Sequence, residues 1–314
     1  MEREIIYEFK SLYREPMRVT GFRFGSGEDS VCIVGALRGN EIQQMYICSQ
    51  LVRSLEDIEK SGGLTKDKSV LIIPSVNNYS LNIGKRFWQT DNTDINRMFP
   101  GYSLGETTQR VAAGLFEHIN TFEYGMQFAS FYIPGRFIPH VRLMTTGYQD
   151  TLDAKLFGLP YVIERKPKPY DTTTLNYNWQ VWECNAFSLF TQATEHIDED
   201  GARQAIHAVL MFLARKGIIR FSGHPGYNSM VLSYESLVNV KSDKAGVFRR
   251  FADVNETVFK GALLAEIVDP LEGSVLREIK SPVSGVVFFC HDSPLTYANE
   301  TLFKIICADD LRND

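Results

Sequence analysis

The sequence contains no long hydrophobic run and no excess of positive charge. None of its apolar stretches approaches the roughly 20 residues that a membrane-spanning helix requires, so no membrane partner is expected. The formal net charge is -5 at pH 7, and lysine and arginine form no cluster along the 314 residues. A nucleic-acid partner is not expected either, because such proteins concentrate basic residues on one face or in one segment.

Cysteine is sparse and shows no pairing pattern. The five cysteines are scattered through apolar surroundings, and no C-x-x-C motif occurs. They are expected to be small core residues in a reducing compartment, and not disulfides or zinc ligands. The first residues, MEREIIYEFKSLYREP, are charged from the start and do not resemble a signal peptide, so a cytoplasmic location is expected. The sequence leaves open whether the protein is a monomer or a homo-oligomer.

Histidine is also rare, and its spacing indicates no metal site. None of the six histidines stands four residues from another, and no H-x-H occurs. His140 is expected to be an imidazole at the start of a strand, and His196 an ordinary loop residue. His196 nevertheless stays a candidate for a catalytic group, because it follows Gln192 and Glu195 closely in the sequence.

What is present is an alternation of apolar strands and amphipathic helices over residues 1–225, which predicts an α/β domain. The run 31–34 is apolar throughout, as expected of a central parallel strand that is buried on both faces. The other expected strands are 4–9 and 18–24 as edge strands, 70–74, 126–133, 139–144 and 186–191, and the expected helices are 41–60 with Asn40 as its N-cap, 107–119 and 200–216. The polar residues 164–180 are predicted to form a surface excursion.

A β-rich region follows over residues 226–314. Short β-type runs recur there between turns and predict a small all-β domain. The runs KGALLAEI and SPVSGVV are similar to the barrel-sandwich fold of lipoyl and biotinyl carriers. No lysine stands at a clear hairpin tip, so a prosthetic group is not expected.

The segment 77–101, NNYSLNIGKRFWQTDNTDINRMFPG, is the most informative part of the sequence. It follows the apolar strand 70–74 and exceeds the 12–15 residues beyond which a structureless loop is usually functional or disordered. Its aromatic residues argue against disorder. Arg86 and Arg97 lie in it among five asparagines, and the planar guanidinium fork binds carboxylates well. The alternative is a well-ordered surface loop with solvated arginines.

The end of this segment, DINRMFPG at 94–101, resembles the DLNR-x-FPG signature of the succinylglutamate desuccinylase/aspartoacylase family. That family is a branch of the zinc carboxypeptidase fold, so the resemblance implies a mixed sheet flanked by helices, closed by a small all-β barrel-sandwich-like domain. It also implies a zinc-dependent hydrolase of amide bonds. The family's substrate-carboxylate group falls on Arg86, Asn96 and Arg97.

The family's metal and base positions are substituted in this sequence. Its H-G-[DN]-E motif falls on 38–41, where Glu41 keeps a metal-ligand position but Arg38 replaces the first histidine. The second histidine position falls on Ala129. Arginine does not lose its proton in proteins, and alanine has no donor atom. The general base falls on Gln192, whose amide cannot accept the proton of a water molecule, with Glu195 as the alternative base.

These substitutions favour a family-like protein that binds an anionic, carboxylate-bearing small molecule without the family's zinc chemistry. We expect Arg38 to pair with Glu41 and to share one cleft with Arg86 and Arg97, so that three cations face one carboxylate. Such a cleft should attract a di- or tricarboxylate, a phosphate or a sulfate. The alternative is an active amidohydrolase of N-acyl amino acids with a rebuilt centre, in which Glu41, Glu195 or His196 takes part.

Zinc content tests this interpretation directly. We expect the isolated protein to hold no stoichiometric zinc, because Arg38 and Ala129 remove both imidazoles and one carboxylate is a weak site. Elemental analysis of the purified protein measures this. About one zinc per chain, as in a four-coordinate protein site, would contradict it.

Overall fold

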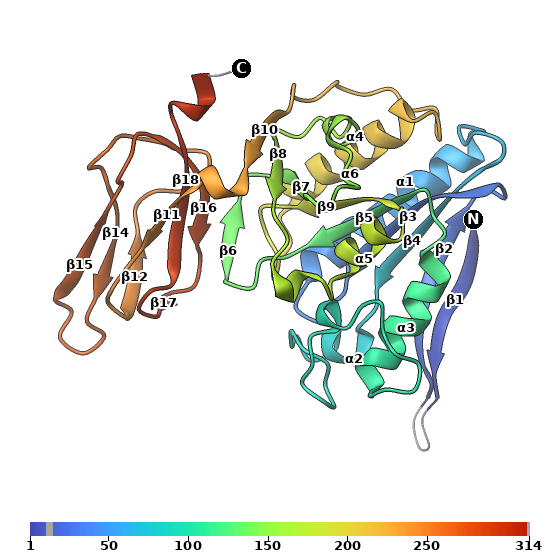
Figure 1. Ribbon diagram of the computed structural model, residues 1–314, viewed down its shortest axis with the longest axis horizontal. Helices are drawn as coiled ribbons and strands as arrows, with labels where there is room; N and C mark the ends of the chain where they lie inside the picture. Colours follow the sequence, from blue (N-terminus) through green and yellow to red (C-terminus); the bar gives the residue numbers. More distant parts are fainter. Residues whose placement is uncertain (11–14, 313–314) are drawn as a thin grey trace.

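The protein consists of an α/β region and a β-rich region that lie side by side (Figure 1). The computed structural model describes residues 1–10 and 15–312, so part of the charged N-terminal stretch, 11–14, lies outside the described residues. None of the helices in the described ranges is long and apolar enough to cross a membrane.

A nine-stranded mixed sheet forms the centre of the α/β region, in the order β1-β2-β4-β3-β5-β9-β7-β8-β10. Its strands are β1 (Glu2–Phe9), β2 (Met17–Phe24), β3 (Glu28–Ala36), β4 (Lys68–Ser75), β5 (Tyr124–Ala129), β7 (His140–Met144), β8 (Tyr161–Arg165), β9 (Asn185–Phe190) and β10 (Met230–Ser233). β3 pairs in parallel with both β4 and β5, as its apolar sequence predicts. β2 was expected at an edge, but it lies between β1 and β4, and β1 is the edge strand.

Side chains of the central strands alternate between two cores. On β3, Val31 and Ile33 pack into one core, whereas Cys32 and Val34 pack into the other. Period-two alternation places successive side chains on opposite faces, and both faces are buried here because helices cover each of them. The first core includes residues of α1 (Ile42–Lys60) and α6 (Glu199–Arg215), and the second includes residues of α3 (Thr107–Ile119) and α5 (Leu175–Val181).

Helix α1 shows how the sequence selects this arrangement. Ile47, Leu51 and Leu55 recur every four residues and are fully buried, which gives the helix one apolar stripe. Asn40 was expected to cap α1, but Glu41 occupies the N-cap position and makes no side-chain cap hydrogen bond. The remaining helices are short: α2 (Asn78–Leu81), α4 (Thr151–Lys155), and the 3-10 turns η1 (Ile95–Arg97), η2 (Pro169–Asp171), η3 (Tyr234–Ser236) and η4 (Asp310–Arg312).

The β-rich region contains two further sheets that share a core. One consists of β11 (Val238–Lys241), β18 (Thr301–Cys307), β16 (Gly285–His291) and β13 (Thr257–Val258), and the other of β15 (Val275–Lys280), β14 (Leu263–Val268), β12 (Gly246–Arg250) and β17 (Leu295–Thr296). β6 (Gly135–Phe137) leaves the α/β region and pairs with β16. The predicted fold class is confirmed. The predicted boundary at residue 225 falls before β10, which belongs to the large sheet.

The predicted surface excursion at 164–180 is wrong for its second half. Helix α5 lies there, and Leu175 and Trp179 are fully buried. The Trp179 indole N–H donates to the carbonyl oxygen of Ile119 at 3.0 Å. Thr174 caps this short helix, and the Asn178 side chain donates to the backbone carbonyls of Thr172 and Thr174, which explains why the sequence is polar although the helix is packed against the sheet.

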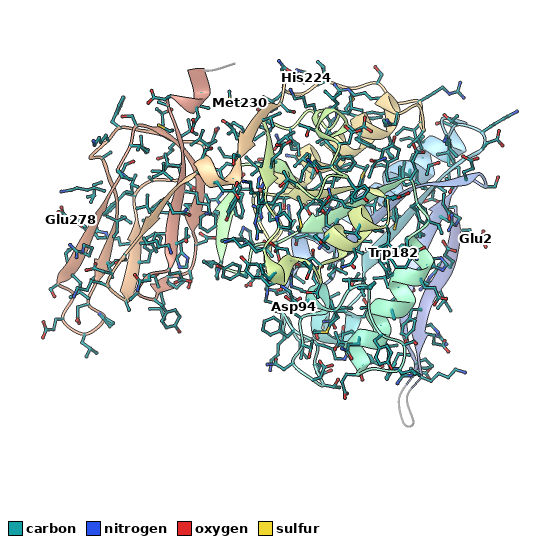
Figure 2. All side chains as sticks on the ribbon, viewed as in Figure 1. Glu2, Asp94, Trp182, His224, Met230 and Glu278 are labelled. Atoms are coloured by element: carbon teal, nitrogen blue, oxygen red, sulfur yellow. The ribbon has the colours of Figure 1, made fainter. Side chains whose placement is uncertain are left out.

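Replacing Trp179 by alanine should therefore lower the free energy of unfolding by about 3–5 kcal/mol, the cost of removing a large buried side chain. Urea denaturation followed by circular dichroism measures this. The matched control is Trp182→Ala just beyond the same helix, because Trp182 is 54% exposed (labelled in Figure 2) and should lose less, about 1–2 kcal/mol, including its edge-to-face contact with Phe116. Equal losses for the two variants would contradict the buried placement of α5.

Candidate functional site

A cavity of about 280 Å³ lies where strands β3, β5 and β9 end. Open α/β sheets commonly bind ligands at the carboxyl ends of their strands. Residues of the segment 77–101 and of the β-rich region complete the wall. Its basic lining residues are Arg38, Arg86, Arg97, Arg142, Arg165, Lys168, Lys241 and Lys304, and its acidic lining residue is Asp171.

Arg38 follows β3 and is held by two carboxylates while only 3% exposed. Its Nε and Nη2 donate to the two oxygens of Asp94, each at 2.9 Å, and its Nη1 donates to Oε1 of Glu41 at 3.0 Å. The expected contact of Arg38 with Glu41 is present. The expectation of a single carboxylate is wrong, because Asp94 (labelled in Figure 2) is a second one.

Glu41 is fully buried, and all of its acceptor positions are used. Oε2 accepts from the backbone N–H groups of Leu37 at 2.9 Å and Arg38 at 3.0 Å. Oε1 accepts from the Arg38 guanidinium and from Oγ of Ser130 at 2.5 Å. A carboxylate has about four acceptor positions, so Glu41 is committed to holding the turn between β3 and α1.

Arg38 and the carboxylates of this cluster stabilise the charged form of one another. Burial acts to lower the pKa of Arg38, but Glu41 and Asp94 outweigh burial and raise that pKa above its ordinary value. Burial acts to raise the pKa of Asp94, but Arg38 outweighs it and lowers that pKa. The guanidinium and the Asp94 carboxylate are therefore both charged at neutral pH.

Arg86 and Arg97 also line the cavity, but neither pairs with a carboxylate of the described residues. Nη1 of Arg86 donates to the carbonyl oxygen of Phe131 at 3.5 Å, and Nη1 of Arg97 donates to that of Asn96 at 2.7 Å. Burial, followed by the charge of Arg38, lowers the pKa of Arg86 to about 10 and also lowers that of Arg97. Both side chains are partly buried, so the alternative of solvated surface arginines does not describe them.

Asn96 is 6% exposed and lies at the same wall. Its Oδ1 accepts from the backbone N–H of Leu175 at 3.0 Å, and its own N–H donates to Oδ1 of Asp94 at 3.0 Å. Asn96 therefore ties the segment 77–101 to the start of α5. Its side-chain Nδ2 donates to no group among the described residues and is the donor of Asn96 that stays available at the wall.

The ends of β5 and β9 form another part of the wall. Gln127 pairs with Ser188 and Ala129 with Phe190, and all four residues line the cavity. The predicted base position, Gln192, lies beyond the last residue of β9 and does not line the cavity. Because side chains two apart on a strand face the same way, Phe190 holds the cavity-facing position at the end of β9, and its ring has no basic atom.

Glu195 and His196 lie outside the basic cavity, at a neighbouring one that shares Arg86, Phe131 and Tyr132 with it. Both are exposed and line a second cavity of about 670 Å³, together with Asn40. Oε1 of Glu195 accepts from Nδ2 of Asn40 at 2.8 Å. Neither residue lines the basic cavity, so a rebuilt centre that joins them to Glu41 is not favoured.

A metal ion has no suitable donor set at the predicted positions. Arg38 brings a positive charge that is already bonded to two carboxylates, Ala129 brings a methyl group, and Glu41 has no acceptor position left. This set does not fit zinc, which binds imidazole, thiolate and carboxylate ligands. No group of three or more histidine, cysteine, aspartate or glutamate side chains that could hold a metal occurs within residues 1–10 and 15–312.

Five basic lining residues were missed by the sequence interpretation. Two of them, Lys168 and Lys241, are exposed, and the other three are Arg142 on β7, Arg165 on β8 and Lys304 on β18. These three surround the ring of Tyr234, which also lines the cavity. The sequence does carry a signal for two of them, because a single charged residue inside an apolar strand, as in HVRLM and TLFKIIC, must be paired or functional when buried.

A protein family model and several solved structures are similar to this chain. Residues 28–128 match the family model of the succinylglutamate desuccinylase/aspartoacylase catalytic domain. No curated protein sequence matches the chain. Among solved structures, a succinylglutamate desuccinylase from Silicibacter sp. TM1040 superposes with a TM-score of 0.78 at 17% identity, and covers 92% of this chain and 88% of its own.

Two further structures are similar over nearly the whole chain. A succinylglutamate desuccinylase/aspartoacylase from Rhodobacter sphaeroides has a TM-score of 0.78 at 18% identity, covering 96% of this chain and 94% of its own. The product-bound ectoine utilization protein EutE (DoeB) from Ruegeria pomeroyi has a TM-score of 0.76 at 18% identity, covering 92% and 89%. The resemblance found in the sequence is thus confirmed: the chain has the succinylglutamate desuccinylase/aspartoacylase fold and carries that family's catalytic-domain pattern in residues 28–128.

Proposed function

We propose that this desuccinylase/aspartoacylase-like protein binds an anionic, carboxylate-bearing small molecule in the basic cavity and does not carry out zinc-dependent amide hydrolysis. The observation that supports this most is the contrast among three arginines. Arg38 is locked between Glu41 and Asp94, whereas Arg86 and Arg97 face the cavity with backbone carbonyls as their hydrogen-bond partners. Two guanidiniums without a paired acid are suited to bind the anionic group of a ligand.

The absence of hydrolysis is proposed from the chemistry at the reacting position. Amide hydrolysis needs an activated water molecule and a group that takes up its proton. At the cavity wall the positions that could supply these carry Arg38, Ala129 and Phe190, none of which holds a metal ion or accepts a proton at neutral pH. No zinc is proposed for this protein on the same grounds.

Arg38 takes over the structural part of a metal ion's role in this proposal. It places a fixed positive charge beside Glu41 and binds the segment 77–101 through Asp94. The cluster of one guanidinium and two carboxylates has one excess negative charge, which offsets only part of the positive charge of Arg86 and Arg97 and leaves both guanidiniums available to an incoming anion.

Anion binding should stabilise the protein in a thermal-shift assay with citrate, N-acetyl-aspartate or sulfate, compared with sodium chloride at equal ionic strength. Ligands that bind only the folded state raise the melting temperature as their concentration exceeds the dissociation constant. Arg97→Ala should abolish the shift, because it removes one of the two guanidiniums. Arg249→Ala on the β-rich region, an exposed residue, is the control and should respond as the wild type does. A wild-type-like response of Arg97→Ala would show that the anions bind elsewhere.

The buried ion cluster itself is tested by Arg38→Met. Removing the cation leaves two carboxylates without their partner, which typically costs about 3–5 kcal/mol of folding free energy. Urea denaturation measures this loss, with Arg277→Met at the exposed pair with Asp243 as the control, expected to lose about 1 kcal/mol or less. Adding Glu41→Gln and Asp94→Asn to Arg38→Met should recover part of the loss, because neutral amides are less costly to bury unpaired. A loss no larger than in the control would contradict the central role of this cluster.

A further inference from the structure

Two neutral amide side chains, those of Gln127 and Asn176, line the basic cavity. Gln127 belongs to β5 and pairs with Ser188 of β9, which also lines the cavity. Asn176 is the second residue of α5, the helix that packs against β5 and β9 (Figure 1). Because side chains two apart on a strand face the same way, Gln127 shares the face of Ala129 and lies two residues further from the end of β5. Gln127 and Asn176 are called the amide pair below.

Both members of the amide pair are almost completely buried, at 1% exposed, and both carry polar atoms that form no hydrogen bond. Neither Oδ1 nor Nδ2 of Asn176 has a partner among the described residues, and the same holds for Nε2 of Gln127. Within the described ranges, Asn176 is the one side chain in which two polar atoms are buried without a partner. Buried polar groups are normally hydrogen-bonded, because burying them unpaired costs folding free energy. The amide pair therefore offers donors and an acceptor to a ligand in the cavity.

Other amides close to this pair are used to hold the backbone. Nδ2 of Asn178, on the same helix, donates to the carbonyl oxygens of Thr172 at 3.0 Å and Thr174 at 2.8 Å. Oδ1 of Asn96 accepts from the backbone N–H of Leu175 at 3.0 Å. The amide pair makes no such contact through the atoms named above, so a role in fixing the backbone does not account for it.

The amide pair differs from the basic residues of the wall in what it can recognise. A cation attracts any anion through its charge, whereas a neutral amide discriminates through the direction of its hydrogen bonds. Asn176 has a donor and an acceptor on one side chain, so it suits a ligand group that both accepts and donates. A carboxylate only accepts, and a hydrocarbon chain does neither. Hydroxyl and carboxamide groups do both.

The amide pair is connected to the residues that bind the anion in the proposed function. Asn176 follows Leu175, whose backbone N–H is held by Asn96, and Asn96 precedes Arg97 in η1. Asn96, Arg97 and the amide pair all line the same cavity of about 280 Å³. A small molecule bound through its anionic group at Arg97 therefore shares one confined volume with the amide pair.

We propose that Gln127 and Asn176 form a neutral subsite that binds a hydroxyl or carboxamide group of the ligand. This inference rests on the proposed function and specifies its ligand class as a carboxylate that also carries such a group. Nε2 of Gln127 and Nδ2 of Asn176 donate to the oxygen of this group, and Oδ1 of Asn176 accepts its hydrogen. The subsite thus selects among anions that the arginines alone do not distinguish.

Titration calorimetry with two matched ligand pairs at equal ionic strength tests this. Malate is compared with succinate, which lacks only the hydroxyl group, and succinamate with levulinate, in which a methyl group replaces the amide nitrogen. The wild type should bind malate or succinamate about tenfold more tightly than its partner, because the partner leaves the buried amides unpaired. The pair that shows the preference tells a hydroxyl from a carboxamide ligand.

Asn176→Leu separates ligand binding from a structural role. It nearly keeps the side-chain volume and removes both polar atoms, so the preference should be lost. The free energy of unfolding of the ligand-free protein should stay the same or rise, because an apolar group replaces an unpaired buried amide. Gln127→Met should behave in the same way. The matched control is Asn178→Leu on the same helix, which should keep the preference but lower the free energy of unfolding, because its two backbone hydrogen bonds are lost.

The results distinguish this inference from the proposed function. A wild type that binds none of the four ligands overturns the proposed function. A wild type that binds both members of each pair equally overturns the neutral subsite alone, as does an Asn176→Leu variant that keeps the full preference. If Asn176→Leu loses as much unfolding free energy as Asn178→Leu in urea denaturation, Asn176 holds the fold and the subsite is again overturned.

Discussion

The ion cluster of Arg38, Glu41 and Asp94 is the interaction on which the rest of the site depends. It joins the turn after β3 to the segment 77–101, which has few regular elements of its own. Asp94 in turn caps η1, and Asn96 within η1 accepts from the first residue of α5. Buried charges are tolerated only when their hydrogen bonds are complete, so this cluster fixes one geometry for three segments at once.

The same cluster explains why the cavity wall keeps an excess of positive charge. Both of its acids pair with one guanidinium, and their net negative charge offsets only part of the charge of the other arginines nearby. Apart from Arg165, which pairs with Asp171, the remaining basic residues of the cavity wall form no ion pair among the described residues, although the protein is acidic overall. A low-dielectric wall of aromatic residues such as Phe190 and Tyr234 strengthens their field, because water screens it less there.

Much of the fold could be predicted from the sequence, because its periodic signals are strong. The buried strand β3, the amphipathic stripe of α1 and the short runs of the β-rich region each depend on local patterns. Helix α5 was missed, because its polar residues bond to backbone carbonyls and conceal a buried face. The motif at 94–101 placed Arg86, Asn96 and Arg97 at one cavity wall, where the structure has them.

The rest of the site depends on where strands end and on which distant residues meet. Counting from a motif cannot reveal that β9 stops at Phe190, which leaves Gln192 beyond the strand and outside the residues that line the basic cavity. Arg142, Arg165 and Lys304 come together only through the order β7-β8 in the large sheet and through the docking of β18 beside it. Asp94 was identified as part of a motif, but its pairing with Arg38 is a tertiary contact.

Strand β6 has a mechanical consequence for this cavity. It continues from the α/β region into the sheet of the β-rich region, where it pairs with β16, and Phe137 packs between Phe288 and Phe289. The two regions are thus joined by strand pairing and by aromatic packing. A hinge motion between them would have to break the hydrogen bonds of β6 with β16 and the contacts of Phe137. A ligand should then enter a preformed cavity without domain closure. Its selectivity should be set by shape and charge complementarity, and not by movement of one region toward the other.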